Sequence, residues 1–141
     1  MTLRHVTGQF WIVILFSSAC GLLAGTCFGG RKGVRENSPA ASVFGGAPAA
    51  TARLQNPYRG EAKAVLAGKK LFGRHCAQCH GNNAEGLGKA PPLRSPIVQQ
   101  APEGVLYWFL KKGKVRAGMP SWSGLPAQQR WQIVSFLKSL Q

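Results

Sequence analysis

Apolar residues recur with a helical period in three stretches of the chain, and glycine or proline lies next to two of them. The first stretch runs from Glu61 to Leu71, and the second lies between Pro102 and Gly113. The third begins near Pro126, a residue favoured in the first turn, and extends to about Leu140. The pattern therefore predicts at least three helices in the C-terminal part of the chain.

Each predicted helix has an apolar face. The first face would contain Ala62, Val65, Leu66, Leu71 and Phe72. The third would contain Ile133, Val134, Leu137 and Leu140. The connections at 81–101 and 114–125 are long and rich in glycine and proline, which is uncommon in a compact domain unless something organises them. A domain of this size has little apolar interior of its own, so we expect a bound group to complete the core.

The N-terminal residues form a separate apolar stretch. No charged residue occurs from Phe10 to Gly30, a length that would rise about 31 Å as a helix and cross a bilayer. The shorter run 10–16, followed by Ser17 and Ala19, fits a secretory signal peptide equally well, and Cys20 is a weaker candidate for lipidation. Residues 1–28 are therefore predicted to be a signal peptide or a membrane anchor.

Residues 29–60 are rich in alanine, proline and glycine and contain few large side chains. Such a composition predicts a flexible linker, with a root-mean-square span of roughly 30 Å. The remaining residues, 61–141, would form the folded domain.

The chain is strongly basic, with 18 Lys+Arg against 4 Asp+Glu and a formal net charge of +14. This imbalance favours acidic protein partners or anionic membrane surfaces.

Residues 76–80 read Cys-Ala-Gln-Cys-His. Two thiols three positions apart, followed at once by an imidazole, are what covalent attachment of haem requires: each thiol adds to a vinyl group, and the histidine binds the iron. A zinc site and a thiol redox site remain alternatives. Zinc lacks a second pair of ligands, because the other cysteines, Cys20 and Cys27, lie in the N-terminal apolar stretch.

Together with other segments, the motif resembles the monohaem class I cytochromes c. The segments that carry the resemblance are 68–72 (Gly-Lys-Lys-Leu-Phe), 90–93 (Ala-Pro-Pro-Leu), 118–122 (Gly-Met-Pro-Ser-Trp) and 131–137 (Trp-Gln-Ile-Val-Ser-Phe-Leu). The resemblance implies a small all-α cytochrome c fold, with helices and long loops around one covalent haem c. It also implies that the last helix crosses the first at Gly68, with Phe136 lying over the glycine.

The resemblance assigns roles to five residues. Cys76 and Cys79 would be the thioether anchors, His80 the proximal iron ligand and Met119 the distal one. The carbonyl of Pro91 would accept the proton of the other ring nitrogen of His80, which fixes the orientation of the ring. His75, next to the motif, is expected to be a solvated side chain.

These features predict a one-electron carrier rather than an enzyme. The resemblance implies that haem is attached after export, so we expect the domain on the periplasmic side of the cytoplasmic membrane. The lysines and arginines that flank the apolar stretch favour the opposite orientation. Expected partners are acidic redox proteins such as a dehydrogenase, a cytochrome complex or a terminal oxidase, and export argues against nucleic acid. Alternatives are a haem subunit of a dehydrogenase or oxidase, and a catalytic or gas-binding haem with an open distal site.

Overall fold

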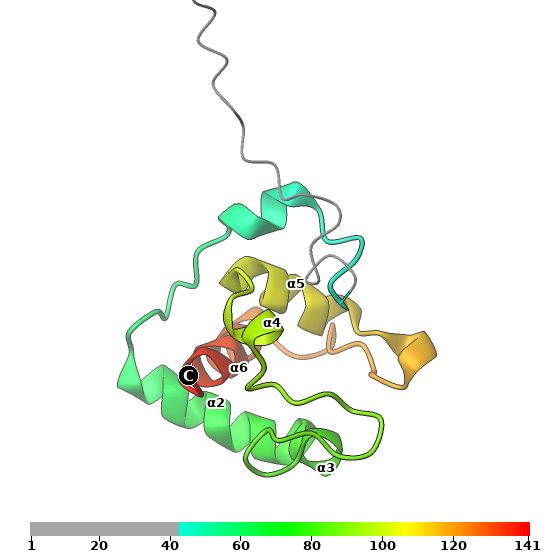
Figure 1. The fold of residues 1–141 in the computed structure, drawn as a ribbon. Helices are drawn as coiled ribbons and strands as arrows, with labels where there is room; N and C mark the ends of the chain where they lie inside the picture. Colours follow the sequence, from blue (N-terminus) through cyan, green and yellow to red (C-terminus); the bar gives the residue numbers. More distant parts are fainter. Residues whose placement is uncertain (1–42) are drawn as a thin grey trace, which may run out of the picture. The chain divides into compact units, whose positions relative to one another are not determined.

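The computed structural model describes residues 43–141, in which helices are joined by long loops (Figure 1). In chain order the elements are η1 (Ala49–Arg53), α2 (Ala62–His75), α3 (Ala77–His80), α4 (Pro96–Gln99), α5 (Glu103–Lys112), η2 (Val115–Ala117) and α6 (Ala127–Lys138). Within this range, the one β-type pairing is a single antiparallel bridge between Lys114 and Met119. The prediction of an all-α fold is confirmed.

The two longest helices, α2 and α6, cross at Gly68. A Cβ atom on Gly68 would lie 1.9 Å from the carbonyl oxygen of Gln132 and 2.9 Å from Cβ of Phe136. The rings of Phe72 and Phe136 pack beside this contact, with centroids 5.2 Å apart. The predicted crossing is confirmed, and it holds because glycine lets the two backbones approach closely.

The buried face of α2 differs from the predicted one at Ala62 and Leu66. The sequence pattern predicts both on the apolar face, yet Ala62 is exposed and so is 62% of the surface of Leu66. The face that packs on α6 contains Ala64, Gly68, Leu71 and Phe72. Leu66 lies two positions after Ala64, which is more than half a turn around the helix, so it points away from α6 when Gly68 faces it.

As the sequence predicts, α5 begins after a proline and ends before a glycine. The helix follows Pro102 and ends before Gly113, whose φ of +67° suits a residue without a side chain. Glu103 lies in its first turn and Lys111 and Lys112 in its last, which complements the helix dipole. On α6, Ile133, Val134 and Leu137 are buried as predicted.

The segment before α2 packs on the helices. Phe44 is 6% exposed and contacts Phe109 on α5 edge to face, with ring centroids 5.2 Å apart. The chain passes so close to the start of α5 that a Cβ atom on Gly104 would lie 2.0 Å from the carbonyl oxygen of Thr51. We call residues 43–60 the N-terminal strap.

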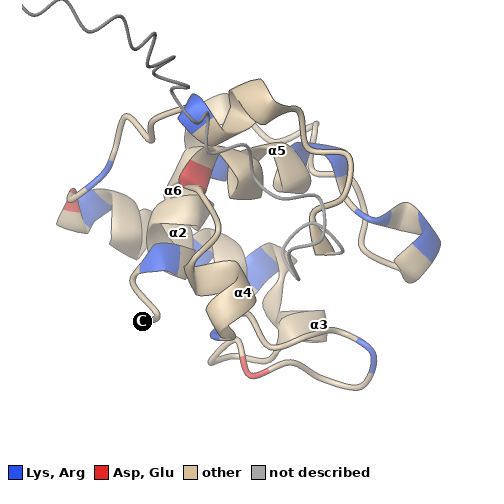
Figure 2. Cartoon of the chain, turned by 45° about the horizontal axis from the view of Figure 1, so that its top comes forward, with Lys and Arg blue, Asp and Glu red and all other residues tan. Residues whose placement is uncertain are grey.

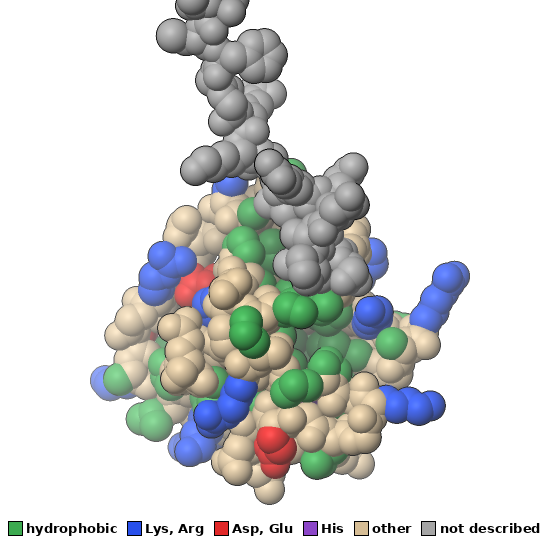
Figure 3. Space-filling view, viewed as in Figure 1, with side chains coloured by type: hydrophobic (Ala, Val, Ile, Leu, Met, Phe, Trp, Pro, Cys, Tyr) green, Lys and Arg blue, Asp and Glu red, His purple; other side chains and the backbone are tan. Residues whose placement is uncertain are grey.

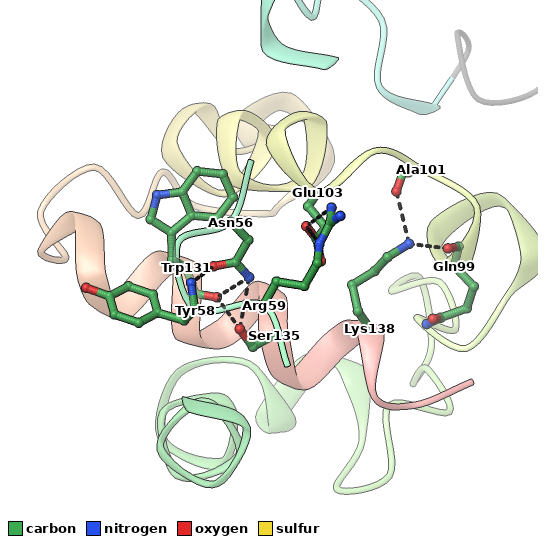
Figure 4. Close-up of polar contacts among 9 residues, drawn as sticks. All are labelled: Asn56, Tyr58, Arg59, Gln99, Ala101, Glu103, Trp131, Ser135 and Lys138. Atoms are coloured by element: carbon green, nitrogen blue, oxygen red, sulfur yellow. Dashed lines mark hydrogen bonds and ion pairs between the residues drawn. The ribbon is translucent and has the colours of Figure 1, made fainter. Parts of the chain in front are cut away.

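Polar contacts hold the end of the strap (Figure 4). The buried Asn56 amide donates to Ser135 Oγ at 2.9 Å, and its Oδ1 accepts from the Tyr58 backbone at 3.0 Å. Arg59 forms a hydrogen-bonded ion pair with Glu103. The hydrogen bond to Glu103 raises the pKa of Arg59 above its ordinary value. The expected flexible linker, 29–60, is thus packed from residue 43 onward, because its few large or amide side chains find partners on α5 and α6.

Residues 1–42 lie outside the described part of the chain, and with them the predicted signal peptide or anchor, Cys20 and the rest of the linker. Among the helices of residues 43–141, none has the length and apolar character needed to span a membrane.

Candidate haem-attachment site

The Cys-x-x-Cys-His motif lies at the junction of α2 and α3. The backbone N–H of Cys76 closes the last turn of α2 by donating to Phe72 O at 2.8 Å. The carbonyl of Cys76 then accepts from the N–H groups of Cys79 and His80, at 3.1 and 2.9 Å. Residues three and four apart share one face of a helical turn, so the local backbone places the two thiols and the imidazole together.

The Cys76 thiol does not resemble that of a redox-active cysteine. Cys76 is half-buried, and burial, with a smaller contribution from Cys79, raises the pKa of its thiol to about 11. Reactive cysteines instead have a lowered pKa, because the thiolate is the nucleophile. In the described residues no group of three or more histidine, cysteine or acidic side chains could hold a metal ion, so a zinc site has no further ligands there.

The histidine of the motif has one ring nitrogen held by the backbone. Nδ1 of His80 lies 3.0 Å from the carbonyl oxygen of Pro91. A carbonyl only accepts hydrogen bonds, so Nδ1 carries the proton and Nε2 keeps its lone pair. That tautomer is the one a neutral imidazole needs in order to bind a metal through Nε2.

The loop after α3 brings Pro91 to the histidine. Gly86 has a φ of +82°, and a Cβ atom there would lie 2.7 Å from Ala90 O and 2.9 Å from the carbonyl carbon of Pro91. Gly86 also donates its N–H to His80 O at 2.8 Å. The glycine therefore lets the loop fold back on itself so that Pro91 reaches the ring of His80.

Met119 lies in a second loop, between α5 and α6. Its backbone pairs with Lys114, and the next residues are tied to the end of α5. Ser121 Oγ donates to Lys111 O at 2.6 Å, and Trp122 N–H donates to Leu110 O at 3.0 Å. At the start of the loop, a Cβ atom on Gly113 would lie 2.4 Å from Pro120 O, so glycine is required there too.

The two loops border one apolar cluster. Cys76, Leu93 and Met119 are all partly buried against the same core, which explains how segments far apart in the sequence meet. Several other large side chains around this cluster are only half-buried: Ile97, Val105, Phe109, Trp122 and Leu125. Figure 3 shows hydrophobic side chains gathered in the middle of one face of the molecule. The two thiols, the imidazole with a free Nε2, the thioether and the apolar surroundings together fit a haem.

Lysine and arginine positions are found around the motif and the methionine loop (Figure 2). The nine basic residues that flank these segments are all exposed: Lys69, Lys70, Arg74, Lys89, Arg94, Lys111, Lys112, Lys114 and Arg116. The glutamates of the described part are Glu61, Glu85 and Glu103, and Glu103 is paired with Arg59. The surface around the site is therefore positively charged.

Sequence reasoning missed several contacts near the site. The sequence predicts a solvated His75, but this residue is half-buried and its ring packs on Trp122, with ring centroids 5.2 Å apart. Tyr107 stacks on Trp131 at 4.1 Å and hydrogen-bonds to the buried Arg130. No local sequence pattern predicts these contacts, because each contact joins residues from different segments of the chain.

Comparison with known proteins decides the family. Residues 63–137, more than half of the chain, match the family described as "Cytochrome C oxidase, cbb3-type, subunit III". The chain belongs to this cytochrome c family. The cytochrome therefore carries covalent haem c, as predicted.

Individual relatives agree with this assignment. The cytochrome is 34% identical over 93 residues to cytochrome c550 of Pseudomonas aeruginosa, covering 61% of this chain and 62% of the relative. It thus spans less than two thirds of that protein. Cytochrome CL from the marine methylotroph Methylophaga aminisulfidivorans has a similar structure, with a TM-score of 0.54, 26% identity, and coverage of 79% of this chain and 71% of the other.

Proposed function

We propose that this cytochrome is a closed-site one-electron carrier, in which Cys76 and Cys79 form the thioether bonds and His80 and Met119 are the axial ligands. The hydrogen bond from His80 Nδ1 to Pro91 O, at 3.0 Å, is the observation that carries this proposal. It leaves Nε2 as the only ring nitrogen free to bind iron. The thioether of Met119 lies on the other loop that borders the same apolar cluster.

When bound, the haem supplies the redox chemistry by cycling its iron between Fe(III) and Fe(II). The chain positions the cofactor and adjusts its electronic properties. A methionine sulfur favours ferrous iron and raises the reduction potential relative to a second histidine. Pro91 keeps the imidazole in one tautomer and one orientation, so the ligand does not have to reorganise when the charge of the iron changes.

Optical spectra of the purified holoprotein test the ligation. We expect a low-spin spectrum, a far-red sulfur-to-iron band in the oxidised protein and no reaction of the reduced protein with carbon monoxide. Met119→Leu keeps the apolar volume but removes the sulfur, so it should lose the band and bind carbon monoxide. Val115→Ala is the matched control, because Val115 lies in the same loop and is 69% exposed.

Two outcomes would contradict this ligation. If the native reduced protein already binds carbon monoxide, the distal site is open and a catalytic or gas-binding haem becomes the better account. If Met119→Leu retains the far-red band, another residue supplies the sixth ligand.

A second candidate function is that of a haem subunit within a larger oxidase. The family description, "Cytochrome C oxidase, cbb3-type, subunit III", favours it. Purification at high salt distinguishes the two, because a diffusing carrier held by charge is released whereas a subunit held by apolar contacts remains bound.

We also propose that the cytochrome works on the periplasmic side of the membrane, after removal or retention of residues 1–28. Covalent attachment of haem after export supports this location. The intact mass of the mature protein distinguishes a cleaved leader, a retained anchor and a lipid on Cys20. The packed strap further suggests that the folded domain begins near Phe44 rather than Glu61.

Acidic redox proteins are the partners that this surface suits. The exposed lysines and arginines around the motif and the methionine loop would attract a negatively charged donor or acceptor and orient it during encounter.

A further inference from the structure

Arg130 is a buried cation in the first turns of α6. Only 6% of its surface is exposed. The single ion pair in the described part of the chain joins Arg59 and Glu103, so no carboxylate there compensates Arg130. Its position near the start of α6 (Ala127–Lys138) is also unfavourable, because the helix dipole there is positive. Burial of an unpaired guanidinium at the positive end of a helix costs free energy, so strong hydrogen bonds must compensate it.

Those hydrogen bonds go to the return arm of the methionine loop. Nη1 of Arg130 donates to the carbonyl oxygens of Ser123, at 3.1 Å, and Leu125, and approaches that of Trp122 at 3.4 Å. These carbonyls come three to six residues after Met119. One guanidinium nitrogen thus contacts several backbone carbonyls of the segment that leads from Met119 to α6.

The other side of the guanidinium is held by an aromatic pair. Nη2 donates to Tyr107 Oη at 2.9 Å, and the guanidinium carbon lies 5.0 Å from the centroid of the same ring. Tyr107 is stacked on Trp131, with an interplanar angle of 12°. Nε, also buried, has no partner in residues 43–141. The planar fork of arginine therefore joins α5, α6 and the loop in a way that a lysine ammonium cannot reproduce.

Met119 itself has few direct restraints. Within residues 43–141, its backbone hydrogen-bonds only to Lys114 in the same loop. The loop is tied to α5 through Ser121 and Trp122, and to α6 through Arg130. Of these ties, that of Arg130 uses a charged donor, and hydrogen bonds with a charged partner are stronger than neutral ones.

We infer that Arg130 is a positioning residue that keeps the methionine loop closed and so keeps the sulfur of Met119 on the iron. This inference rests on the proposed axial role of Met119. Loop opening would strip the buried guanidinium of its carbonyl acceptors, which makes the open state rare. Removal of the fork should open the loop while the α2–α6 crossing stays intact.

Heating the oxidised holoprotein separates local opening from unfolding. The far-red sulfur-to-iron band reports Met119, and far-ultraviolet circular dichroism reports the helices. In the wild type we expect both signals to be lost together. In Arg130→Lys and Arg130→Met the band should disappear at a clearly lower temperature than the helix signal, and the reduced protein should bind carbon monoxide about tenfold faster or more because the open loop is more populated.

Asn56→Ala is the matched control. It removes a buried hydrogen bond to Ser135 on the same helix but does not touch the loop. Its two signals should shift together, without faster carbon monoxide binding. If the two signals of Arg130→Lys also shift together, Arg130 only stabilises the fold and the inference is wrong. If the wild type shows no far-red band and binds carbon monoxide, the axial role of Met119 is wrong and the inference falls with it.

Discussion

Gly68 on α2 lies directly against the Gln132 carbonyl on α6, so close that a Cβ atom would be 1.9 Å from the oxygen. This contact sets the crossing of the two helices, and the crossing places the end of α2, where the haem-binding motif begins, relative to the rest of the core. Gly73 lies on the same helix but a Cβ atom there would meet nothing within 4 Å.

We therefore expect Gly68→Ala to lower the free energy of unfolding by about 2 kcal/mol or more, because the backbones must separate. Gly73→Ala should instead raise it by up to about 1 kcal/mol, since alanine favours the helix. Denaturant titration of both holoproteins measures the difference. Equal effects of the two substitutions would show that the close approach does not control stability.

Asn56 tests whether the N-terminal strap belongs to the folded domain. The residue is 5% exposed, and its amide donates a hydrogen bond to Ser135 Oγ on α6. Loss of a buried polar partner costs about 1–3 kcal/mol, so Asn56→Ala should lower the free energy of unfolding by that amount. Gln55→Ala, at the exposed neighbouring position, should have almost no effect. A strap that is free in solution would make both variants neutral.

Gly86 and Gly88 form a second matched pair, in the loop that carries Pro91. Both have positive φ, +82° and +57°, so alanine is strained at either position. Only at Gly86 would the new Cβ atom also meet the backbone of Ala90 and Pro91, whereas at Gly88 nothing lies within 4 Å.

Gly86→Ala should therefore weaken the bond from His80 Nδ1 to Pro91 and make the imidazole a poorer donor to ferric iron. We expect the reduction potential to rise by on the order of tens of mV. Gly88→Ala should change stability but not the potential. Potentiometric titration measures the reduction potentials of both variants. Equal reduction potentials would show that the hydrogen bond to Pro91 does not affect how strongly His80 donates to the iron.

Arg116 tests the charged surface. It is exposed on η2, three residues before Met119, whereas Arg53 is exposed on η1 in the strap. Arg116→Glu and Arg53→Glu change the net charge equally. At low ionic strength Arg116→Glu should slow electron transfer with an acidic redox partner by about tenfold, because local charge steers encounter.

Stopped-flow measurements across a salt series check this prediction. The difference between the two variants should shrink at high salt, because exposed charges are screened. If both variants slow the reaction equally at every salt concentration, net charge matters and the surface near the methionine loop does not.

The sequence determined the elements whose signals are local. Proline and glycine mark the ends of α5, and the spacing of Ile133, Val134 and Leu137 predicts the buried stripe of α6, as the structure confirms. The haem motif is equally local, because its chemistry depends on residue types within five positions. The resemblance to cytochromes c then supplied the fold and the contact of Phe136 with Gly68.

Only the tertiary structure decided which polar and aromatic residues meet. Asn56 looked like part of a linker, yet it bonds to Ser135 on the last helix. Arg130 belongs to no recognisable motif, yet it is buried and donates hydrogen bonds to backbone carbonyls that follow Met119. Leu66 fitted a helical stripe, yet the close approach at Gly68 turns it to solvent. Such contacts join segments far apart in the chain, and their free energy depends on burial and geometry that exist only after the helices have packed.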